Sequence, residues 1–330
     1  MSEPAPVDNR WSEPSRAPDQ PLRIATAEAG TPEWYLAAAV KRLAGEAGIE
    51  LEPKRFEGGE ARRVASVHEG MAEIGIALVE TAGWAYRAES AYDGWRHTSL
   101  RAIAAIEQTQ WLGVAARWEA RVGSLEELAE ARGLRLLVPL PGGDSASWTF
   151  LAAEALAAHG ARPAQLAELG WRVEDVSAAG RRVRALDFDL LVAPIGPYRG
   201  AQARLWQEAS ALASLRFLPL SERALGRLES EHGVGRGSLP ADYLRGVDEP
   251  VPTIRFDRWL VFASERLEDE VAVAVARALE AGRSRLAPLH ASLDPLRPLD
   301  DVRIPVHRAV VRDRRERGLE ARDNLSQAPA

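Results

Sequence analysis

The sequence predicts an α/β protein of two lobes, in which mostly parallel sheets are flanked by helices and joined by crossover strands. Three observations lead to this prediction. Short β-rich runs alternate with longer helical stretches, extended chain at 100–116 interrupts the alternation once, and a long extended run covers 252–263. Strand–helix alternation with short connections is typical of a parallel sheet covered by helices. At the interruption and at the late run, we expect the chain to cross between lobes.

The first α/β unit begins at Leu22. Thr31 and Pro32 mark its clearest helix start, because Thr is a good N-cap and Pro lacks the N–H that would be unpaired at the first helical position. Gly70 is expected to end the second helix. The strands of this unit are expected at 22–26, 50–56 and 73–79, and its helices at 32–46, 60–69 and 81–89.

The second unit follows two extended runs, 100–106 and 112–116, that have no helix between them. It starts with a short helix capped by Ser124. The remaining strands are expected at 134–140, 171–176, 188–193, 215–218 and 252–263, and the remaining helices at 147–159, 178–186, 200–212 and 267–282, with more helix to about 290. The chain then divides into a disordered leader (1–21), the first part of lobe 1 (22–107), lobe 2 (108–258), a return to lobe 1 (259–318) and a flexible tail (319–330).

Composition excludes several classes of protein. None of the 330 residues is cysteine, which excludes disulfides, Cys-ligated zinc, iron–sulfur clusters and a thiol nucleophile. The net charge of −6 argues against a nucleic-acid partner, because nucleic-acid binding usually needs a basic surface. No apolar run approaches the ~18 residues of a membrane span, so we do not expect a membrane-embedded protein.

Polar and small residues follow several predicted strands, at the edge where open α/β sheets bind ligands. Three loops, 27–35, 56–61 and 139–148, each place a small-residue turn before a helix N-terminus, whose N–H groups and dipole attract anions. The alternative is that Gly only supplies the turn and that Thr, Asp or Ser only caps the helix. The candidate ligand-binding residues of these loops are Glu28, Gly30, Thr31, Trp34 and Tyr35, then Gly58 and Gly59, then Gly142, Gly143, Asp144, Ser145 and Ser147.

Two further loops add candidates. Glu80 and Trp84 follow the strand at 73–79, and Pro194 and Tyr198 follow the strand at 188–193. Tryptophans beside the loops, at 34, 84, 111 and 148, are typical of the aromatic wall of a small-molecule pocket, although core packing is the more ordinary role of each.

No motif in the sequence indicates catalysis, a metal or a cofactor. The six histidines have no metal-ligand spacing, and neither GxSxG nor GxxxxGK[ST] occurs. The glycine-rich segment 233–237 is expected to be a flexible loop, because it follows a helix and precedes Ser-Leu-Pro. Glu80, Asp144 and His97 are only nominal acid–base candidates.

Seven segments in order resemble one family. They are LRIATAEAGTPEWYLAAAVKRL (22–43), FEGGEARRVASVHEGMAEIGIALVETAGWAY (56–86), LRAIAAI (100–106), GSLEELAEARGLRLLVPLPGGDSASW (123–148), DFDLLVAPIG (187–196), EPVPTIRFDRWLVFASERL (249–267) and DDVRIPVHRAVVRDRRERGL (300–319). Their order and spacing resemble those of the TAXI-type solute-binding receptors of TRAP transporters, which have the type II periplasmic-binding-protein fold and are near the NMT1/THI5-like proteins. The resemblance implies two lobes that close on one small organic ligand, commonly an organic acid or amino acid, and a membrane permease that recognises the closed form.

The chain departs from the family pattern at three loops. Glu28 and Ala29 stand where glycines are usual, Asp144 is added to a loop that usually reads PGSGT, and Glu80 stands where Gln is frequent. Three added carboxylates would repel an anionic ligand if they are poorly solvated. We therefore expect a ligand other than a plain dicarboxylate, one that carries a cationic group or an aromatic ring.

The N-terminal residues 1–21 contain no apolar h-region of a signal peptide. As the sequence is written, we expect a cytoplasmic protein, and a periplasmic one if the true start lies upstream. A cytoplasmic protein leaves two alternatives to a transport receptor. One is a cofactor-free enzyme such as an aromatic-acid decarboxylase, since some decarboxylases resemble this fold, and the other is a ligand sensor, which would need a partner domain.

Overall fold

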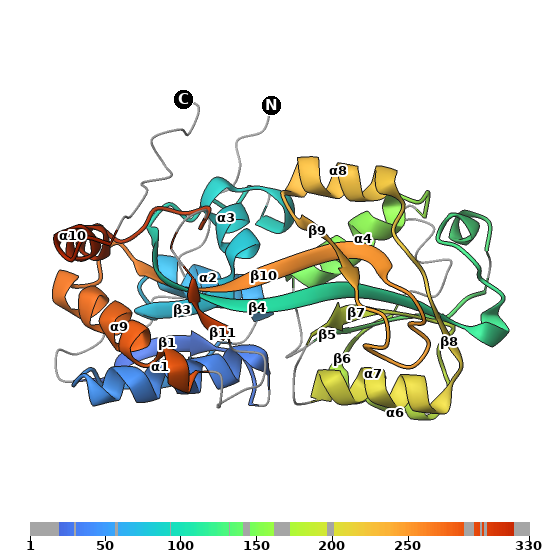
Figure 1. Ribbon diagram of the computed structural model, residues 1–330, viewed down its shortest axis with the longest axis horizontal. Helices are drawn as coiled ribbons and strands as arrows, with labels where there is room; N and C mark the ends of the chain where they lie inside the picture. Colours follow the sequence, from blue (N-terminus) through green and yellow to red (C-terminus); the bar gives the residue numbers. More distant parts are fainter. Residues whose placement is uncertain are drawn as a thin grey trace, which may run out of the picture.

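The computed structural model describes residues 20–29, 31–56, 59–92, 94–131, 133–140, 146–161, 172–196, 201–286, 294–297, 299 and 302–319. Within them one continuous sheet has the strand order β2-β1-β3-β10-β4-β7-β5-β6, and helices lie against both of its faces (Figure 1). The outer strands of each half are parallel, and the two central strands run antiparallel to their neighbours. The predicted α/β class, with parallel strands joined by crossing strands, is confirmed.

The first half of the sheet follows the prediction closely. Its strand β3 is buried along its whole length, because it lies between β1 and β10 with helices on both sides. Every predicted element of this half is confirmed to within two residues. The bounds are β1 (Leu22–Thr26), α1 (Pro32–Glu46), β2 (Leu51–Arg55), α2 (Gly59–His68), β3 (Ile74–Leu78), α3 (Val79–Arg87) and, from the later chain, α9 (Asp269–Ala281).

The second half repeats the strand–helix alternation. Its parallel strands β6, β5 and β7 lie between α6 and α7 on one side and α4 on the other (Figure 1), and β7 is buried along its whole length. The predicted elements are again confirmed, with ends shifted by one or two residues. The bounds are β5 (Leu136–Leu140), α4 (Ala146–Ala157), β6 (Arg172–Asp175), α6 (Val176–Arg184), β7 (Leu190–Ile195), α7 (Ala201–Leu212) and β8 (Leu215–Phe217).

Two long strands cross from one half to the other, β4 (Leu100–Arg117) and β10 (Val251–Ser264). The two separate runs predicted at 100–106 and 112–116 are therefore wrong, because one strand covers both. The polar residues between them stay in the ladder, and two of them are buried. The Nε2 of Gln110 donates to Oε1 of Gln108 at 3.2 Å, and Nε1 of Trp259 donates to the same oxygen. Hydrogen bonds of this kind offset the cost of burying polar groups in a strand.

Two predictions in the later chain are corrected. The helix that Ser124 was expected to cap is only a 3₁₀ turn, Glu126–Ala129, and Ser124 does not cap it; Leu125 and Leu128, three residues apart, are both buried by this tighter turn. The expected flexible loop at 233–237 overlaps a strand, β9 (Gly235–Leu239), which pairs with β10. A Cβ on Gly237 would lie 2.8 Å from Cβ of Arg255, so close strand pairing explains this glycine.

The remaining elements were not predicted. They are α8 (Glu222–His232), β11 (Asp294–Arg297), α10 (Arg308–Glu316) and two further 3₁₀ turns, Ser90–Tyr92 and Trp118–Ala120. Of the further helix expected from 283 to about 290, the described residues form one 3₁₀ turn, Arg283–Arg285. The predicted leader and tail lie almost entirely outside the described residues.

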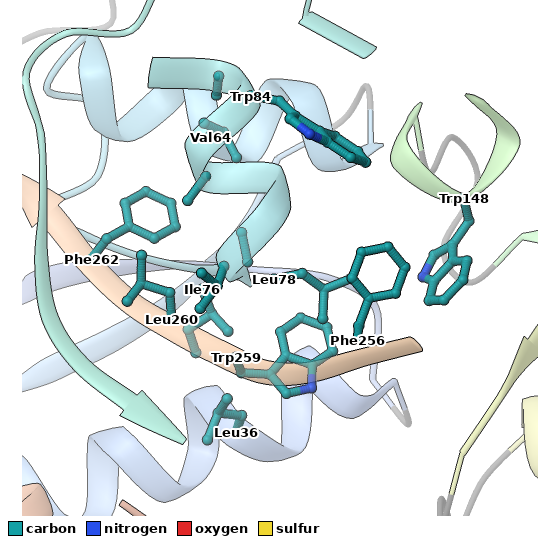
Figure 2. Close-up of a cluster of buried hydrophobic side chains, with 14 of the residues drawn as sticks. Leu36, Val64, Ile76, Leu78, Trp84, Trp148, Phe256, Trp259, Leu260 and Phe262 are labelled. Atoms are coloured by element: carbon teal, nitrogen blue, oxygen red, sulfur yellow. The ribbon is translucent and has the colours of Figure 1, made fainter. Parts of the chain in front are cut away.

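One hydrophobic core joins the two halves of the sheet. It contains Ile24 of the first half and Leu151 of the second, both fully buried. Figure 2 shows aromatic rings of this core, among them Trp148, whose ring packs edge-on against Phe256 at a centroid distance of 4.9 Å. Buried aromatic rings of this size contribute several kcal/mol each to stability. Apolar packing therefore holds the halves together beneath the polar groups described next.

Candidate functional site

Four helix N-termini that follow strands are linked by side-chain contacts. The first turns of α1 and α2 meet through Glu33 and Arg63, α2 meets α4 through Glu60 and Ser147, and α4 meets α3 through Ser147 and Thr81. The helices α1, α2 and α3 belong to the first half of the sheet, and α4 belongs to the second. Because the carboxyl ends of parallel strands form the ligand-binding edge of open α/β sheets, this group is the candidate site.

The start of α1 is closed by its own residues. The Thr31 hydroxyl donates to the carbonyl oxygen of Glu28 at 2.8 Å and accepts from the backbone N–H of Trp34 at 3.2 Å. Glu28 is exposed, and its carboxylate pairs with Arg55 at 2.5 Å. Trp34 packs edge-on against Tyr35, with ring centroids 5.1 Å apart. These contacts match the alternative in which Thr31 caps the helix.

A buried ion pair joins the first turn of α1 to α2. Nη2 of Arg63 is 3.7 Å from Oε1 of Glu33, and neither side chain is more than 14% exposed. Oε2 of Glu33 and Nε of Arg63 are buried without a hydrogen-bond partner. Burial raises the pKa of Glu33 despite the opposing charge of Arg63. The pair is thus only partly compensated and keeps unused hydrogen-bonding capacity.

The start of α4 is closed by a residue from the other half of the sheet. The backbone N–H of Ser147 donates to Oε2 of Glu60 at 3.3 Å, and the Ser147 hydroxyl lies 3.0 Å from that of Thr81. Nearby, the Tyr92 hydroxyl is buried without a hydrogen-bond partner. Burial raises the pKa of Tyr92 well above its usual value; Glu60 raises it further, and Arg63 opposes the shift. Glu60, Arg63 and Tyr92 are therefore electrostatic neighbours.

Glu80 lies in a different environment from this group. Burial raises its pKa, the positive charges of Arg303 and Arg258 oppose the shift, and the negative charge of Asp257 adds to it. Its Oε2 is buried without a hydrogen-bond partner. The neighbours of Glu80 are on β10 and on the segment 302–306, so the structure does not bring this carboxylate to Glu60.

Two other candidates have structural partners. Nε1 of Trp84 donates to the carbonyl oxygen of His232 at 2.8 Å, and its ring packs edge-on against Phe150 at 6.0 Å. The carbonyl oxygen of Pro194 accepts from Nε1 of Trp206 at 3.1 Å. Core packing therefore accounts for Trp84 and Pro194.

Not every candidate residue is described. Gly59 is buried at the start of α2 with φ +71, a conformation that favours glycine. The others, which lie outside the described residues, are Gly30, Gly58, Gly142, Gly143, Asp144, Ser145 and Tyr198.

Sequence reasoning found the loops of the site but missed its charged residues. Glu33 lies within the predicted loop 27–35 and Glu60 within 56–61. Both look like ordinary first-turn acids, which helix dipoles favour on exposed surfaces. Arg63 and Tyr92 carried no signal, because only the approach of other elements buries them.

A group of possible metal ligands lies between α4 and α8. Single ligand atoms of Glu154, Glu231 and His232 lie within 4.8 Å of one another. The Arg227 guanidinium already pairs with both carboxylates, at 3.3 Å and 2.9 Å. Nδ1 of His232 is 2.9 Å from the Ser90 hydroxyl. The described contacts are those of an ion-pair network.

Comparison with protein families matches residues 24–318 to the NMT1-like family model, nearly the whole chain. The chain belongs to the NMT1-like family. No curated protein matches the sequence significantly. The family match confirms the NMT1-like part of the predicted resemblance.

Solved structures place this NMT1-like protein among the periplasmic-binding-protein folds. One similar structure is the binding-protein component of an ABC phosphonate transporter from Pseudomonas aeruginosa, with TM-score 0.52 and 11% identity, covering 94% of this chain and 92% of that one. Another is PhnD1 from Prochlorococcus marinus in complex with methylphosphonate, with TM-score 0.50 and 9% identity, covering 91% and 98%. At these identities the likeness shows the fold alone, so the two-lobed periplasmic-binding-protein fold is confirmed.

A membrane span does not appear in the part of this NMT1-like chain that the structure describes. None of the helices there is both long and apolar enough to cross a bilayer.

Proposed function

We propose that this protein captures a small organic solute between the two halves of its sheet, as the receptor subunit of a transporter. The observation that carries the proposal is the contact of Ser147 with Glu60 and Thr81, which brings buried polar groups of both halves together. Buried polar groups that converge from two lobes are the usual construction of a small-molecule site. The similar phosphonate-transporter component and the methylphosphonate complex support a receptor role.

The proposal also divides the chain into two lobes that move relative to each other. One lobe would comprise 22–107 with 259–318 and the other 108–258, and β4 and β10 would form the hinge between them. A solute that contacts both lobes would stabilise the closed form, because it binds that form better than the open one. The order and spacing of the sequence segments favour a TAXI-type receptor that delivers its solute to a TRAP permease.

The alternative of a cofactor-free decarboxylase is not adopted. Glu80 is a described candidate with a perturbed pKa, but its neighbours are Arg303, Arg258 and Asp257 rather than the residues at Ser147. A perturbed acid that faces structural charges is as readily explained by folding as by catalysis.

The test is a thermal-shift screen of the purified protein with amines, amino acids, dicarboxylates, phosphonates and aromatic acids, followed by mass analysis of the best solute after incubation. A solute at 100 times its dissociation constant adds about 2.7 kcal/mol of stability, which is readily visible. A clear shift with the solute recovered unchanged supports a receptor. A consumed solute, or no shift across the panel, contradicts it. For transport, cell fractionation of the native host should find the protein in the periplasm.

A further inference from the structure

The N-terminus of α4 is occupied by a carboxylate of the protein itself. A helix N-terminus at a sheet edge normally favours an anion, because its N–H groups and dipole point outward. Here the backbone N–H of Ser147 donates to Oε2 of Glu60, whose residue is only 6% exposed. A solute carboxylate or phosphonate would have to displace Glu60 from this position and lie beside its charge.

The groups around Glu60 call for a hydrogen-bond donor with positive charge. Among the residues that the structure describes, Glu33 and Glu60 supply two carboxylates and Arg63 one guanidinium to this cluster, and Glu60 acts electrostatically on Glu33. Oε2 of Glu33 is buried and has no donor. A buried acceptor without a donor costs free energy that a bound N–H group would recover.

The same cluster also offers donors to a neutral oxygen. Tyr92 is 2% exposed, and its hydroxyl has no hydrogen-bond partner. Nε of Arg63 is likewise buried without a hydrogen-bond partner. Tyr92 is an electrostatic neighbour of both Glu60 and Arg63, and Glu60 and Arg63 both act on Glu33. In the described part of this cluster, the buried atoms without a hydrogen-bond partner are thus one carboxylate oxygen and two groups able to donate.

From these contacts we propose that the solute is an organic amine without a carboxylate, and that Glu60 is the residue that excludes anions. Its ammonium group donates to Glu33 and Glu60, and a hydroxyl or carbonyl oxygen accepts from Tyr92 or Arg63. This inference rests on the proposed receptor function. The sequence analysis expected a ligand other than a plain dicarboxylate partly because of Glu28 and Glu80. The present inference does not depend on those two carboxylates, because Glu28 pairs with Arg55 and Glu80 lies near the charge of Arg303.

The test is isothermal titration calorimetry of the full chain with ethanolamine and putrescine as amines and with malate and succinate as dicarboxylates. We expect the wild type to bind an amine at least tenfold more tightly than either dicarboxylate. Glu60→Gln keeps the size of the side chain and removes its charge, so it should weaken amine binding at least tenfold and strengthen dicarboxylate binding. Glu46→Gln, which removes an exposed carboxylate at the opposite end of α1, is the matched control and should change each dissociation constant less than twofold.

The outcomes separate this inference from the proposed function. Tight dicarboxylate binding by the wild type, or unchanged selectivity in a folded Glu60→Gln, overturns the amine proposal and leaves a receptor. Absence of binding by the wild type to any compound of the wider screen overturns both. Where Glu60→Gln does not fold, as judged by circular dichroism, Glu33→Gln gives the same test, because it removes the other carboxylate of the cluster.

Discussion

Two helices of the site begin in opposite ways. Helix α1 is capped by Thr31, a residue of its own loop, whereas the first turn of α4 is closed by Glu60, which lies 87 residues away in the sequence on the other half of the sheet. A local cap stabilises one helix whatever the two halves do. A cap from the other half is formed only when the halves approach, so it links helix stability to closure.

The apolar counterpart of this link is Trp84, and its removal should have the largest effect on stability. Trp84 is 1% exposed, and it joins α3 to α8 through the bond to the carbonyl oxygen of His232 and to α4 through contact with Phe150. Trp84→Ala should lower the free energy of unfolding by about 3–5 kcal/mol, measured by urea denaturation. Trp84→Phe, which keeps most of the packing and loses the hydrogen bond, should cost less than half as much. Equal costs would show that the hydrogen bond, not the packing, joins the helices.

Ser147→Ala should break one of the two described polar links that Ser147 makes between the halves and leave the backbone N–H of Ser147 bonded to Glu60. Its hydroxyl is 3.0 Å from that of Thr81, and both residues are fully buried. The change leaves the Thr81 hydroxyl without this partner, at a cost of about 1–3 kcal/mol in the free energy of unfolding. The control is Ser230→Ala on the exposed face of α8, which should change stability by less than about 0.5 kcal/mol. Equal effects of the two changes would contradict a buried link at Ser147.

The sequence predicted what depends on neighbours in the chain. The strand Leu22–Thr26 and the Thr31 cap follow from short-range patterns, and the structure has both. The strand at 235–239 was missed because its glycines make sense only against Arg255 of a remote partner. Likewise, Gln108 was assigned outside a strand because the amide and indole groups that satisfy it come from the folded ladder.

The charged residues of the site were missed for a related reason. Glu60 is a favourable first-turn acid in any helix, and nothing in its local sequence distinguishes an exposed position from a buried one. Its burial arises where α2 meets α4, a contact between distant segments. Local reasoning could therefore locate the loops of the site but could not assign charges to its interior.

Thr31→Ala should remove the local cap and the hydroxyl's bond to the carbonyl oxygen of Glu28, both within the same loop. The expected cost is about 1 kcal/mol of unfolding free energy, with solute affinity changed less than twofold. Ser221→Ala removes the corresponding cap of α8, where the side chain accepts from the backbone N–H of Ala224, and should cost a similar amount. If Thr31→Ala weakens solute binding tenfold while Ser221→Ala does not, the Thr31 hydroxyl contacts the solute. The start of α1 would then take part in solute binding as the start of α4 does, rather than being only a local cap.

The subtlest difference between the two helix starts is the pH dependence introduced by Glu33, in the first turn of α1. Burial raises its pKa, so between the ordinary carboxyl value and the raised one the folded protein binds more protons than the unfolded chain. Stability is therefore lost as pH rises through this window, and the full penalty is present above it. Glu33→Gln lacks the penalty, so its stability relative to wild type should increase from about pH 4 to pH 7 in urea titrations. The increase should persist in 0.5 M NaCl, because salt screens buried charges weakly. A difference that shrinks as pH rises would mean that Arg63 overcompensates the burial of Glu33, and the cluster would then have no need of a cationic solute.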